Sequence, residues 1–375
     1  MGQKRRTKGD GAVRERDNGT WEARYVFEGR KRSIYGKTED DVRSRLKTIN
    51  AEIELNIHRE PCKMKLEEWL DIWLWDYKAN NIRPLTFESY ERIIRLYIKP
   101  KLGSYKLSDL KNHDIQKEVN KLGASRTTEL FCTILKASLR HAVRLDMLLK
   151  NPSEYIIIPR KNKRAIKPLN VKERHELTKA LSSHRLGVAF YLLVVTGMRK
   201  GELLALKWDD IDFRNKMINV SKSSKRIRVF KNREPAGYEN VEGNTKTEKG
   251  RRIIPMLDKT VAMMKYHMAK QNIEKVKAKQ YQDKQYVFCS RQGKVISGRN
   301  FNKYFYKFLA DNGIDKITPH GLRHTFATAG LENGIELKSM QELLGHSSIN
   351  VTANIYTHVS NSQKRQEIQK LKDAF

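Results

Sequence analysis

A short basic stretch constrains the fold of this chain more than any other feature of the sequence. It runs over Pro159–Arg164, is basic at four of its six positions, and is followed closely by Pro168. Prolines and runs of like charge are typical of exposed linkers rather than of packed cores. Helical patterns dominate before this stretch, whereas helices and strands alternate after it. The 375 residues are therefore expected to form several domains.

Residues 64–160 contain four successive stretches of apolar residues at helical spacing. Such stretches are typical of amphipathic helices that pack together, so an all-α bundle is expected. The tryptophans and tyrosines occupy the apolar positions, which favours a place in the core over a role in base stacking. The last stretch runs from Thr127 to about Leu149, and Asn151-Pro152 closes it. The apolar positions of the first three stretches are Leu66, Trp69, Leu70, Trp73 and Leu74; Phe87, Tyr90, Ile94 and Tyr97; and Leu107, Ile115, Val119 and Leu122.

Residues 1–60 have a different pattern, in which three strand-like runs precede one helix. Turn signals at Asp17-Asn18-Gly19 and Glu28-Gly29 separate the runs, and Thr38 is expected to cap a helix over roughly Glu39–Asn56. A sheet that carries many arginines could enter a groove of DNA, although a small α+β domain with unspecific surface charges fits the same pattern. The expected strands are Val13–Arg16, Trp21–Phe27 and Lys31–Tyr35, and the arginines are Arg14, Arg16, Arg24, Arg30 and Arg32.

Residues 169–375 are expected to form a mainly α domain with a small antiparallel sheet. An apolar helix over Val188–Thr196 should end at Gly197, and the pattern is helical again from Arg299. The predicted fold is therefore multidomain, with a small α+β module, an all-α domain and a mainly α domain in that order. The expected strands are Met217–Val220, Arg226–Phe230 and Arg252–Met256, with a further short one between Tyr286 and Phe288.

The charge of the chain points to a polyanionic partner. Lys and Arg number 75 against 43 Asp and Glu, a formal net charge of +32, which attracts nucleic acid, anionic membranes or acidic proteins. The sequence contains no apolar run long enough to span a bilayer, and its charged start is unlike a secretory signal. Nucleic acid is therefore the favoured partner. Three cysteines without a CxxC pair favour a reducing, intracellular setting over a disulfide framework.

Two stretches of the last region carry basic residues at turns. In Thr196-Gly197-Met198-Arg199-Lys200-Gly201-Glu202-Leu203, glycines flank Arg199 between two helical segments, so the backbone there could approach a phosphate. Turns of this kind are usually structural. Residues 246–255 are interpreted as a hairpin turn between two strands, with Lys246 at its leading edge. Lys246 could donate a proton to a leaving oxygen, but a solvated charge cluster is the ordinary explanation, and Lys249 shares the turn.

A third stretch, Thr318–His324, combines an arginine with two histidines. Pro319 suits the first turn of a helix that begins near Thr318, and His320 and Arg323 then lie on one face of that turn. An imidazole and a guanidinium at a helix N-terminus can clamp a phosphate and move a proton. A metal site from His320 and His324 is the competing interpretation, but no carboxylate or cysteine nearby completes it.

Two further stretches follow near the end of the chain. Gly345 is expected to end a helix, which leaves His346 at the inner surface of the domain. Tyr356 comes ten residues later on a short helical segment. A lone tyrosine is usually a packing residue, so its interest depends on the residues that precede it.

The ordered set resembles the tyrosine recombinases, also called phage-type integrases. The flanking stretches Thr-Gly-Met-Arg, Leu-Arg-His-Thr-Phe-Ala-Thr and Leu-Gly-His-Ser match as well, and nothing departs from the family's catalytic pattern. Residues 64–160 look like the family's core-binding domain, and residues 1–60 look like the arm-binding domain of phage and conjugative-transposon integrases. The matching catalytic residues are Arg199, Lys246, His320, Arg323, His346 and Tyr356.

The resemblance implies a chemistry for each of these residues. Arg199 and Arg323, helped by His346, would bind the non-bridging oxygens of the scissile phosphate. Tyr356 would attack phosphorus and form a 3′-phosphotyrosine with release of a 5′-hydroxyl, while His320 would take the phenolic proton. A 5′-hydroxyl of a partner strand could then reverse the attack without ATP.

The resemblance also implies the partners. Lys246 would protonate the leaving 5′-oxygen, and since guanidiniums neutralise the phosphate, neither a metal nor another cofactor is expected. Four protomers should assemble on double-stranded DNA as a homotetramer, helped by an accessory DNA-bending or directionality protein, in the bacterial cytoplasm at the nucleoid. The tail Ser362–Phe375 is expected to be an amphipathic helix that docks on a neighbouring subunit or on its own domain.

Two other functions fit parts of the sequence. A type IB-like topoisomerase would use the same chemistry without joining two sites, but the first two modules argue against it. A non-catalytic DNA-binding regulator would need the charge and not the tyrosine.

Overall fold

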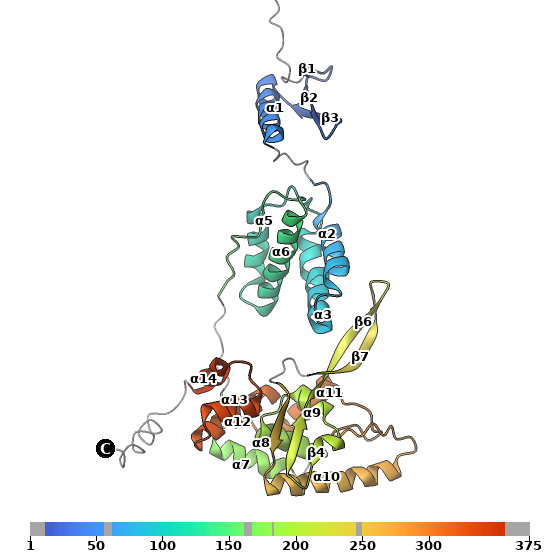
Figure 1. Cartoon of the computed structure of the whole chain (residues 1–375), viewed down its shortest axis with the longest axis vertical. Helices are drawn as coiled ribbons and strands as arrows, with labels where there is room; N and C mark the ends of the chain where they lie inside the picture. Colours follow the sequence, from blue (N-terminus) through green and yellow to red (C-terminus); the bar gives the residue numbers. More distant parts are fainter. Residues whose placement is uncertain (1–11, 56–61, 161–166, 182–183, 245–249, 357–375) are drawn as a thin grey trace, which may run out of the picture. The chain divides into compact units, whose positions relative to one another are not determined.

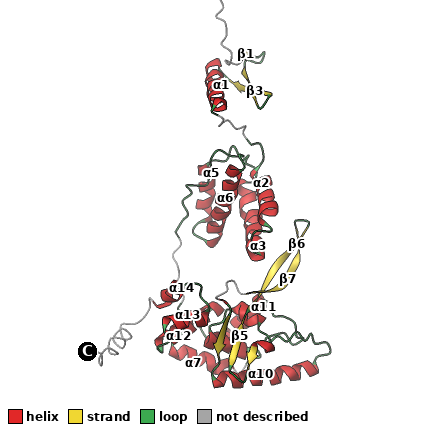
Figure 2. Ribbon diagram, viewed as in Figure 1, coloured by secondary structure: helices red, strands yellow, loops and turns green. Residues whose placement is uncertain are grey.

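The computed structural model describes residues 12–55, 62–160, 167–181, 184–244 and 250–356. The chain divides into two compact units, Met1–Lys161 and Asn162–Phe375 (Figure 1). A three-stranded sheet with one helix comes first, then a group of helices, then a mainly helical unit with small antiparallel sheets (Figure 2). The predicted fold class is confirmed. Among the helices of the described residues, none has the length and apolar character to cross a membrane.

The first unit begins with the sheet β1-β2-β3, whose neighbouring strands are antiparallel. Helix α1 covers one face of this sheet, where Ala23 packs with Val42 and Leu46. The hydroxyl of Thr38 accepts a hydrogen bond from the Asp41 backbone N–H at 3.3 Å, so the predicted cap is confirmed. The elements are β1 (Ala12–Glu15), β2 (Trp21–Phe27), β3 (Arg30–Gly36) and α1 (Glu39–Glu54).

The remainder of the first unit is helical, as expected from its apolar periodicity. Trp69 and Trp73 are fully buried, and the Trp69 indole N–H donates to the Ser138 carbonyl at 3.1 Å, which confirms that these rings belong to the core. Two helices continue into π-helical turns. The elements are α2 (Leu66–Ile72), η1 (Trp73–Lys78), α3 (Pro84–Ile93), η2 (Ile94–Ile98), α4 (Lys99–Leu102), α5 (Asn112–Leu122) and α6 (Arg126–Arg144).

The second unit is built around one apolar helix, α8. Its residues are almost all buried, and they share a core with α9, α11, α12 and the sheet β4-β5-β8. The elements are α7 (Val171–Ala180), α8 (Gly187–Thr196), α9 (Lys200–Ala205), η4 (Trp208–Asp210), β4 (Ile211–Asp212), β5 (Met217–Val220), β6 (Lys222–Lys231), β7 (Glu234–Asn244), β8 (Arg252–Pro255), α10 (Asp258–Lys277), α11 (Gly298–Asp311), α12 (Pro319–Glu332), α13 (Leu337–Leu344) and α14 (Ile349–Tyr356).

The strand pairing of the second unit corrects two predictions. The two strands that flank the stretch predicted as a hairpin turn do not pair with each other, because β7 pairs with β6 whereas β8 pairs with β5 in another sheet. The hairpin turn lies instead at Asn232 and Arg233, both with positive φ, and the β6–β7 ribbon extends away from the body of the unit (Figure 1). Tyr286 forms an isolated bridge with Lys207 rather than part of a strand.

Candidate active site

The candidate site is organised around the C-terminal end of α13. Gly345 ends this helix in a left-handed conformation, with φ of 63°. The N–H of Gly345 bonds to the Glu342 carbonyl at 3.0 Å, and the N–H of His346 bonds to the Gln341 carbonyl at 3.1 Å. This Schellman arrangement satisfies two carbonyls of the last turn and leaves the next three, on residues 343–345, without backbone partners.

Three arginines from three segments satisfy those remaining carbonyls. Arg252 Nε donates to the Leu343 carbonyl at 2.6 Å, and Arg323 Nη2 donates to the Leu344 carbonyl at 2.5 Å. Arg199 Nη2 donates to the third carbonyl, on Gly345, at 3.1 Å. The partial negative charge of a helix C-terminus favours cations at this position. The end of α13 therefore gathers three guanidiniums that are far apart in sequence.

A buried carboxylate balances part of this charge. Glu202 Oε1 accepts from Arg199 Nη1 at 2.7 Å, and its Oε2 accepts from Arg252 Nη2 at 2.8 Å. The exposed fraction of the Glu202 side chain is only 2%. Burial alone would raise the pKa of this carboxyl, but the hydrogen bond and charge of Arg252, followed by those of Arg199, hold it below its ordinary value. One carboxylate against three guanidiniums leaves an excess of positive charge.

Arg199 reaches this position because two glycines shape the segment around it. Gly197 ends α8 with φ of 60°, and Arg199 is the N-cap residue of α9, so the arginine lies in the turn between two helices as predicted. A Cβ on Gly201 would lie 2.5 Å from the Ser223 hydroxyl, because β6 passes close to α9 there. The Arg199 side chain keeps 43% of its surface exposed.

Arg323 projects from the first turns of α12, as the sequence predicts. The Thr318 hydroxyl accepts from the Gly321 N–H at 2.9 Å, and Pro319 occupies the first helical position. The guanidinium is 2% exposed and also donates from Nη1 to the Gly197 carbonyl at 2.8 Å. Burial and then the charge of Arg199 lower its pKa. Two of its five N–H groups are thus committed to backbone carbonyls, and the others can meet a ligand.

His320 lies one turn before Arg323 on the same helix. Burial lowers the pKa of His320, and the charges of Arg323 and Arg199 lower it further. Its ring lies edge-on to that of His324, with 4.8 Å between the ring centroids. Within the described parts of the chain, no group of three or more His, Cys, Asp or Glu could hold a metal ion. A neutral imidazole beside two guanidiniums can accept a proton near neutral pH.

His346 connects the end of α13 to the next helix. Its Nδ1 lies 2.9 Å from the hydroxyl of Thr352, which is fully buried in α14. Burial first, and then the charges of Arg323 and Arg199, lower the pKa of His346 to about 4. The ring is therefore neutral at pH 7. Helix α14 packs against α12 and α13 and ends at Tyr356, one turn after Thr352, so the short helical segment predicted for Tyr356 is confirmed.

Two of the predicted features fall outside the described residues. Lys246 lies within 245–249, and the tail Ser362–Phe375 lies beyond residue 356. The structure thus brings Arg199, Arg323 and His346 together at one helix end and places His320 on the helix of Arg323.

Two residues of the site were missed from the sequence. Glu202 and Arg252 both lie inside stretches that the sequence singles out, but the sequence patterns predict no role for either residue. Glu202 follows Arg199 by three positions, the spacing at which a side chain reaches back to the N-cap residue, and its Oε2 accepts from the Arg199 N–H at 2.9 Å. That spacing could have identified Glu202. No local signal predicts that Arg252 reaches α13.

Comparisons of sequence identify the family. Residues 167–363 match the model of the phage integrase family, and residues 65–123 match that of the N-terminal SAM-like domain of phage integrases. A relative from Caldanaerobacter subterraneus subsp. tengcongensis, named tyrosine recombinase XerC-like, is 34% identical over 360 residues, which is 92% of each chain. An integrase of Streptomyces ambofaciens is 25% identical over 368 residues, 94% of this chain and 93% of its own. The chain belongs to the phage integrase family of tyrosine recombinases, enzymes that cleave and rejoin DNA in site-specific recombination.

Solved structures agree on the fold. The Tn1549 transposon integrase in complex with transposon right end DNA superposes with a TM-score of 0.68 at 22% identity, over 82% of this chain and 100% of that one. A lambda integrase tetramer bound to a Holliday junction gives a TM-score of 0.57 at 20% identity, over 94% and 96% of the two chains. At these identities the likeness shows a shared multidomain architecture.

Proposed function

We propose that this chain is the integrase of a mobile genetic element, and that it recombines DNA through a covalent bond between Tyr356 and a 3′-phosphate. The observation that supports the proposal most is the cluster of Arg199 and Arg323 on consecutive carbonyls of one helix end, with positive charge in excess. A phosphodiester carries the negative charge that would balance this excess. The bacterial cytoplasm, at the nucleoid, is where such a substrate is found.

The chemistry follows from the charges. The free N–H groups of Arg199 and Arg323 bind the two non-bridging oxygens, where negative charge grows as a fifth ligand approaches phosphorus. His346, neutral at pH 7, donates a further hydrogen bond to one of them. The Tyr356 oxygen attacks phosphorus, the bond from phosphorus to the 5′-oxygen breaks, and a 3′-phosphotyrosine forms.

Two protons move in this step. The phenolic proton of Tyr356 passes to His320, whose lowered pKa keeps the ring neutral and able to accept it. Lys246 gives a proton to the departing 5′-oxygen. Attack of a 5′-hydroxyl on the phosphotyrosine reverses both transfers, so strand joining needs no ATP, metal or other cofactor.

The other domains bind the substrate. Residues 64–160 serve as the core-binding domain beside the scissile phosphate, and residues 169–375 carry the chemistry. Residues 1–60 bind arm-type sites through the sheet face opposite α1, where the exposed side chains of Arg14 and Arg24 stand. Exchange between two duplexes needs four protomers on DNA, together with an accessory protein that bends DNA or sets direction.

Replacement of the nucleophile tests the proposal. An end-labelled duplex from the terminus of the element that encodes the chain is incubated with wild-type protein and with Tyr356→Phe. We expect a denaturant-resistant protein–DNA adduct with wild type alone, and equal binding of the duplex by both proteins. An adduct with Tyr356→Phe would refute the assignment of the nucleophile.

A supercoiled plasmid without a terminus of the element separates recombination from relaxation. We expect little turnover of this plasmid, because cleavage requires the bound site. Efficient relaxation would indicate a topoisomerase instead.

A further inference from the structure

We propose that Arg252 is a positioning residue for DNA cleavage, which fixes the distance between the two phosphate-binding arginines without touching DNA. The inference rests on the proposed function of Arg199 and Arg323. It concerns a residue of β8 that lies within the stretch 246–255 but is not one of the matching catalytic residues.

The contacts of Arg252 join β8 to α9 and to the end of α13. Its Nε donates to the Leu343 carbonyl of α13 at 2.6 Å, and its Nη2 donates to Glu202 Oε2 of α9 at 2.8 Å. Its Nη1 donates to the carbonyl of Gly250, two residues before its own strand begins, at 3.2 Å. The guanidinium thus spans the N-terminal part of α9 and the C-terminal end of α13.

These two segments hold Arg199 and Arg323, the proposed phosphate-binding pair, in place. Glu202 uses its other oxygen to hold Arg199, and the carbonyls that follow Leu343 hold Arg323 and Arg199. A rigid, planar guanidinium with fixed donors sets the separation of the segments that it bridges, which a flexible ammonium cannot do.

The contacts of Arg252 point to an indirect role. Each nitrogen of its guanidinium already donates to a protein oxygen, on Leu343, Gly250 or Glu202, so we assign it no contact with DNA. Arg252 therefore acts through its neighbours. Without Arg252, Arg199 is the arginine that still donates hydrogen bonds to Glu202 among the described residues, and its guanidinium would turn toward both carboxylate oxygens. Arg199 would then be turned away from the phosphate.

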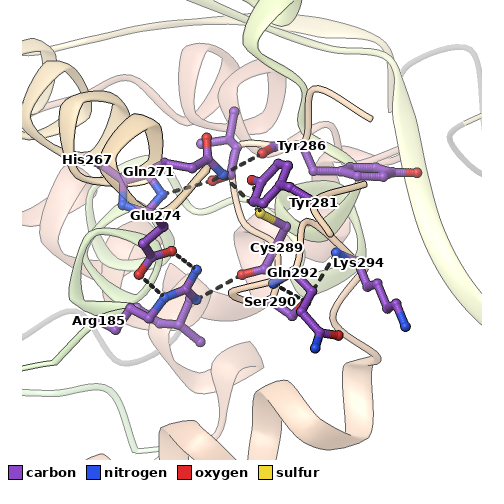
Figure 3. A network of polar contacts seen from close by, with 12 residues as sticks. Arg185, His267, Gln271, Glu274, Tyr281, Tyr286, Cys289, Ser290, Gln292 and Lys294 are labelled. Carbon is purple, nitrogen blue, oxygen red and sulfur yellow. Dashed lines mark hydrogen bonds and ion pairs between the residues drawn. The ribbon is translucent and has the colours of Figure 1, made fainter. Parts of the chain in front are cut away.

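The test compares two arginines of the same unit that each bind a carboxylate and a backbone carbonyl. Arg185 is the matched control: it forms a two-pronged ion pair with Glu274 at 2.5 and 2.7 Å and donates to the Cys289 carbonyl at 2.8 Å (Figure 3). None of its partners holds a residue of the candidate site. Arg252→Met removes a guanidinium from one carboxylate and two backbone carbonyls, and Arg185→Met removes one from one carboxylate and one backbone carbonyl.

Cleavage is measured at saturating duplex from the terminus of the encoding element. For Arg252→Met we expect an adduct rate lower by about 10²-fold, the loss that a displacement of about 1 Å causes, with the dissociation constant of the duplex unchanged. Arg252→Lys keeps the positive charge but lacks the planar guanidinium, so its adduct rate should lie between those of wild type and Arg252→Met. Arg185→Met should form adduct at nearly the wild-type rate. Equal losses for Arg252→Met and Arg185→Met would overturn the proposal.

A methylphosphonate at the scissile position distinguishes positioning from general loss of structure. This neutral group needs less charge from Arg199 and Arg323, so the defect of Arg252→Met should shrink on it. A defect of the same size on phosphate and methylphosphonate would overturn the proposal.

A further readout does not depend on catalysis. In the DNA-free protein, Arg252→Met should speed amide hydrogen exchange at Gly345 and His346, whereas Arg185→Met should not. If wild type forms no adduct, the proposed function fails while this exchange still tests Arg252. Unchanged exchange would overturn the role of Arg252 alone.

Discussion

Glu22 in the N-terminal sheet and Glu202 in the second unit are both buried carboxylates that hold two arginines. Glu22 pairs with Arg14 at 2.7 Å and Arg24 at 3.1 Å, and it accepts from the Ser33 hydroxyl at 2.7 Å. Its partners keep 56% and 49% of their side-chain surface exposed. Glu202 instead shares its charge between a half-exposed arginine and Arg252, which is 5% exposed.

This difference separates two uses of one interaction. At Glu22 the arginines are spread over an open sheet face, where water screens the pairs and each contributes little to stability. At Glu202 the surroundings are dry, so an unpaired charge is costly and the arrangement is fixed. The arrangement at Glu22 suits contact with many phosphates, whereas the arrangement at Glu202 suits holding a single phosphate in a fixed position.

The largest effect is expected for Glu202→Gln, which leaves three guanidiniums without a counter-charge. We expect adduct formation to fall by about 10²-fold and the unit to lose about 3–5 kcal/mol of unfolding free energy. Urea unfolding and single-turnover cleavage measure the two effects. Glu22→Gln is the matched variant, and it should leave both quantities near wild type. A comparable loss of stability in Glu22→Gln would show that the two sites do not differ as described.

Two left-handed glycines give the next comparison. A Cβ on Gly197 (φ +60°) would lie 2.5 Å from Phe326 Cδ1 and 2.8 Å from Leu344 Cδ2, whereas one on Gly29 (φ +73°) would meet nothing within 4 Å. Both alanine variants suffer the backbone cost of about 1–2 kcal/mol. Gly197→Ala should lose about 1–3 kcal/mol more through overpacking and should also slow cleavage, since the Gly197 carbonyl holds Arg323. Equal destabilisation in thermal unfolding would contradict this.

The smallest expected effect is a difference in how acid lowers the stability of the two units. The pKa of His346 is lowered from 6.5 to about 4, so the folded unit binds fewer protons than the unfolded chain. The resulting stability is complete above pH 6.5 and is lost as the pH falls to 4; His320 and His324 act in the same direction. Hydrogen bonds from Ser33 and Arg14 lower the pKa of Glu22 from 4.5 to about 2, so its contribution disappears only between those values.

Unfolding of each unit as a function of pH measures this difference. His346→Asn should make the unfolding free energy of the second unit depend less steeply on pH between 6.5 and 4. Glu22→Gln should leave the pH dependence of the first unit unchanged in that range. A loss of stability of the N-terminal sheet already at pH 6 would contradict the difference expected between Glu22 and His346.

The sequence predicts the local parts of this molecule well. The cap at Thr318, the helix end at Gly345 and the turn at Gly197 all depend on residues within one helical turn, and each is confirmed. The burial of Trp69 and Trp73 follows from periodicity alone. The proposed catalytic residues are recognised as an ordered set, because they resemble the family's set in their order and flanking residues.

The parts that could not be predicted depend on contacts between distant segments. Strand β8 pairs with β5 rather than with the strand before it, because the β6–β7 ribbon is inserted between them in sequence. Arg252 stands 91 residues from its partner Leu343. Alternation and turn signals carry no information about such pairs, so the bridging role of Arg252 is visible only in three dimensions.

The surplus of guanidinium over carboxylate at the end of α13 has a practical consequence. In the absence of DNA, the N–H donors that we propose to bind a phosphodiester are equally open to small tetrahedral oxyanions of the buffer. Sulfate and inorganic phosphate should act as competitive inhibitors of cleavage and should raise the melting temperature of the protein by binding its folded state. Kinetic work on this recombinase is therefore best carried out in chloride or acetate, and crystals grown from sulfate should contain that ion between Arg199 and Arg323.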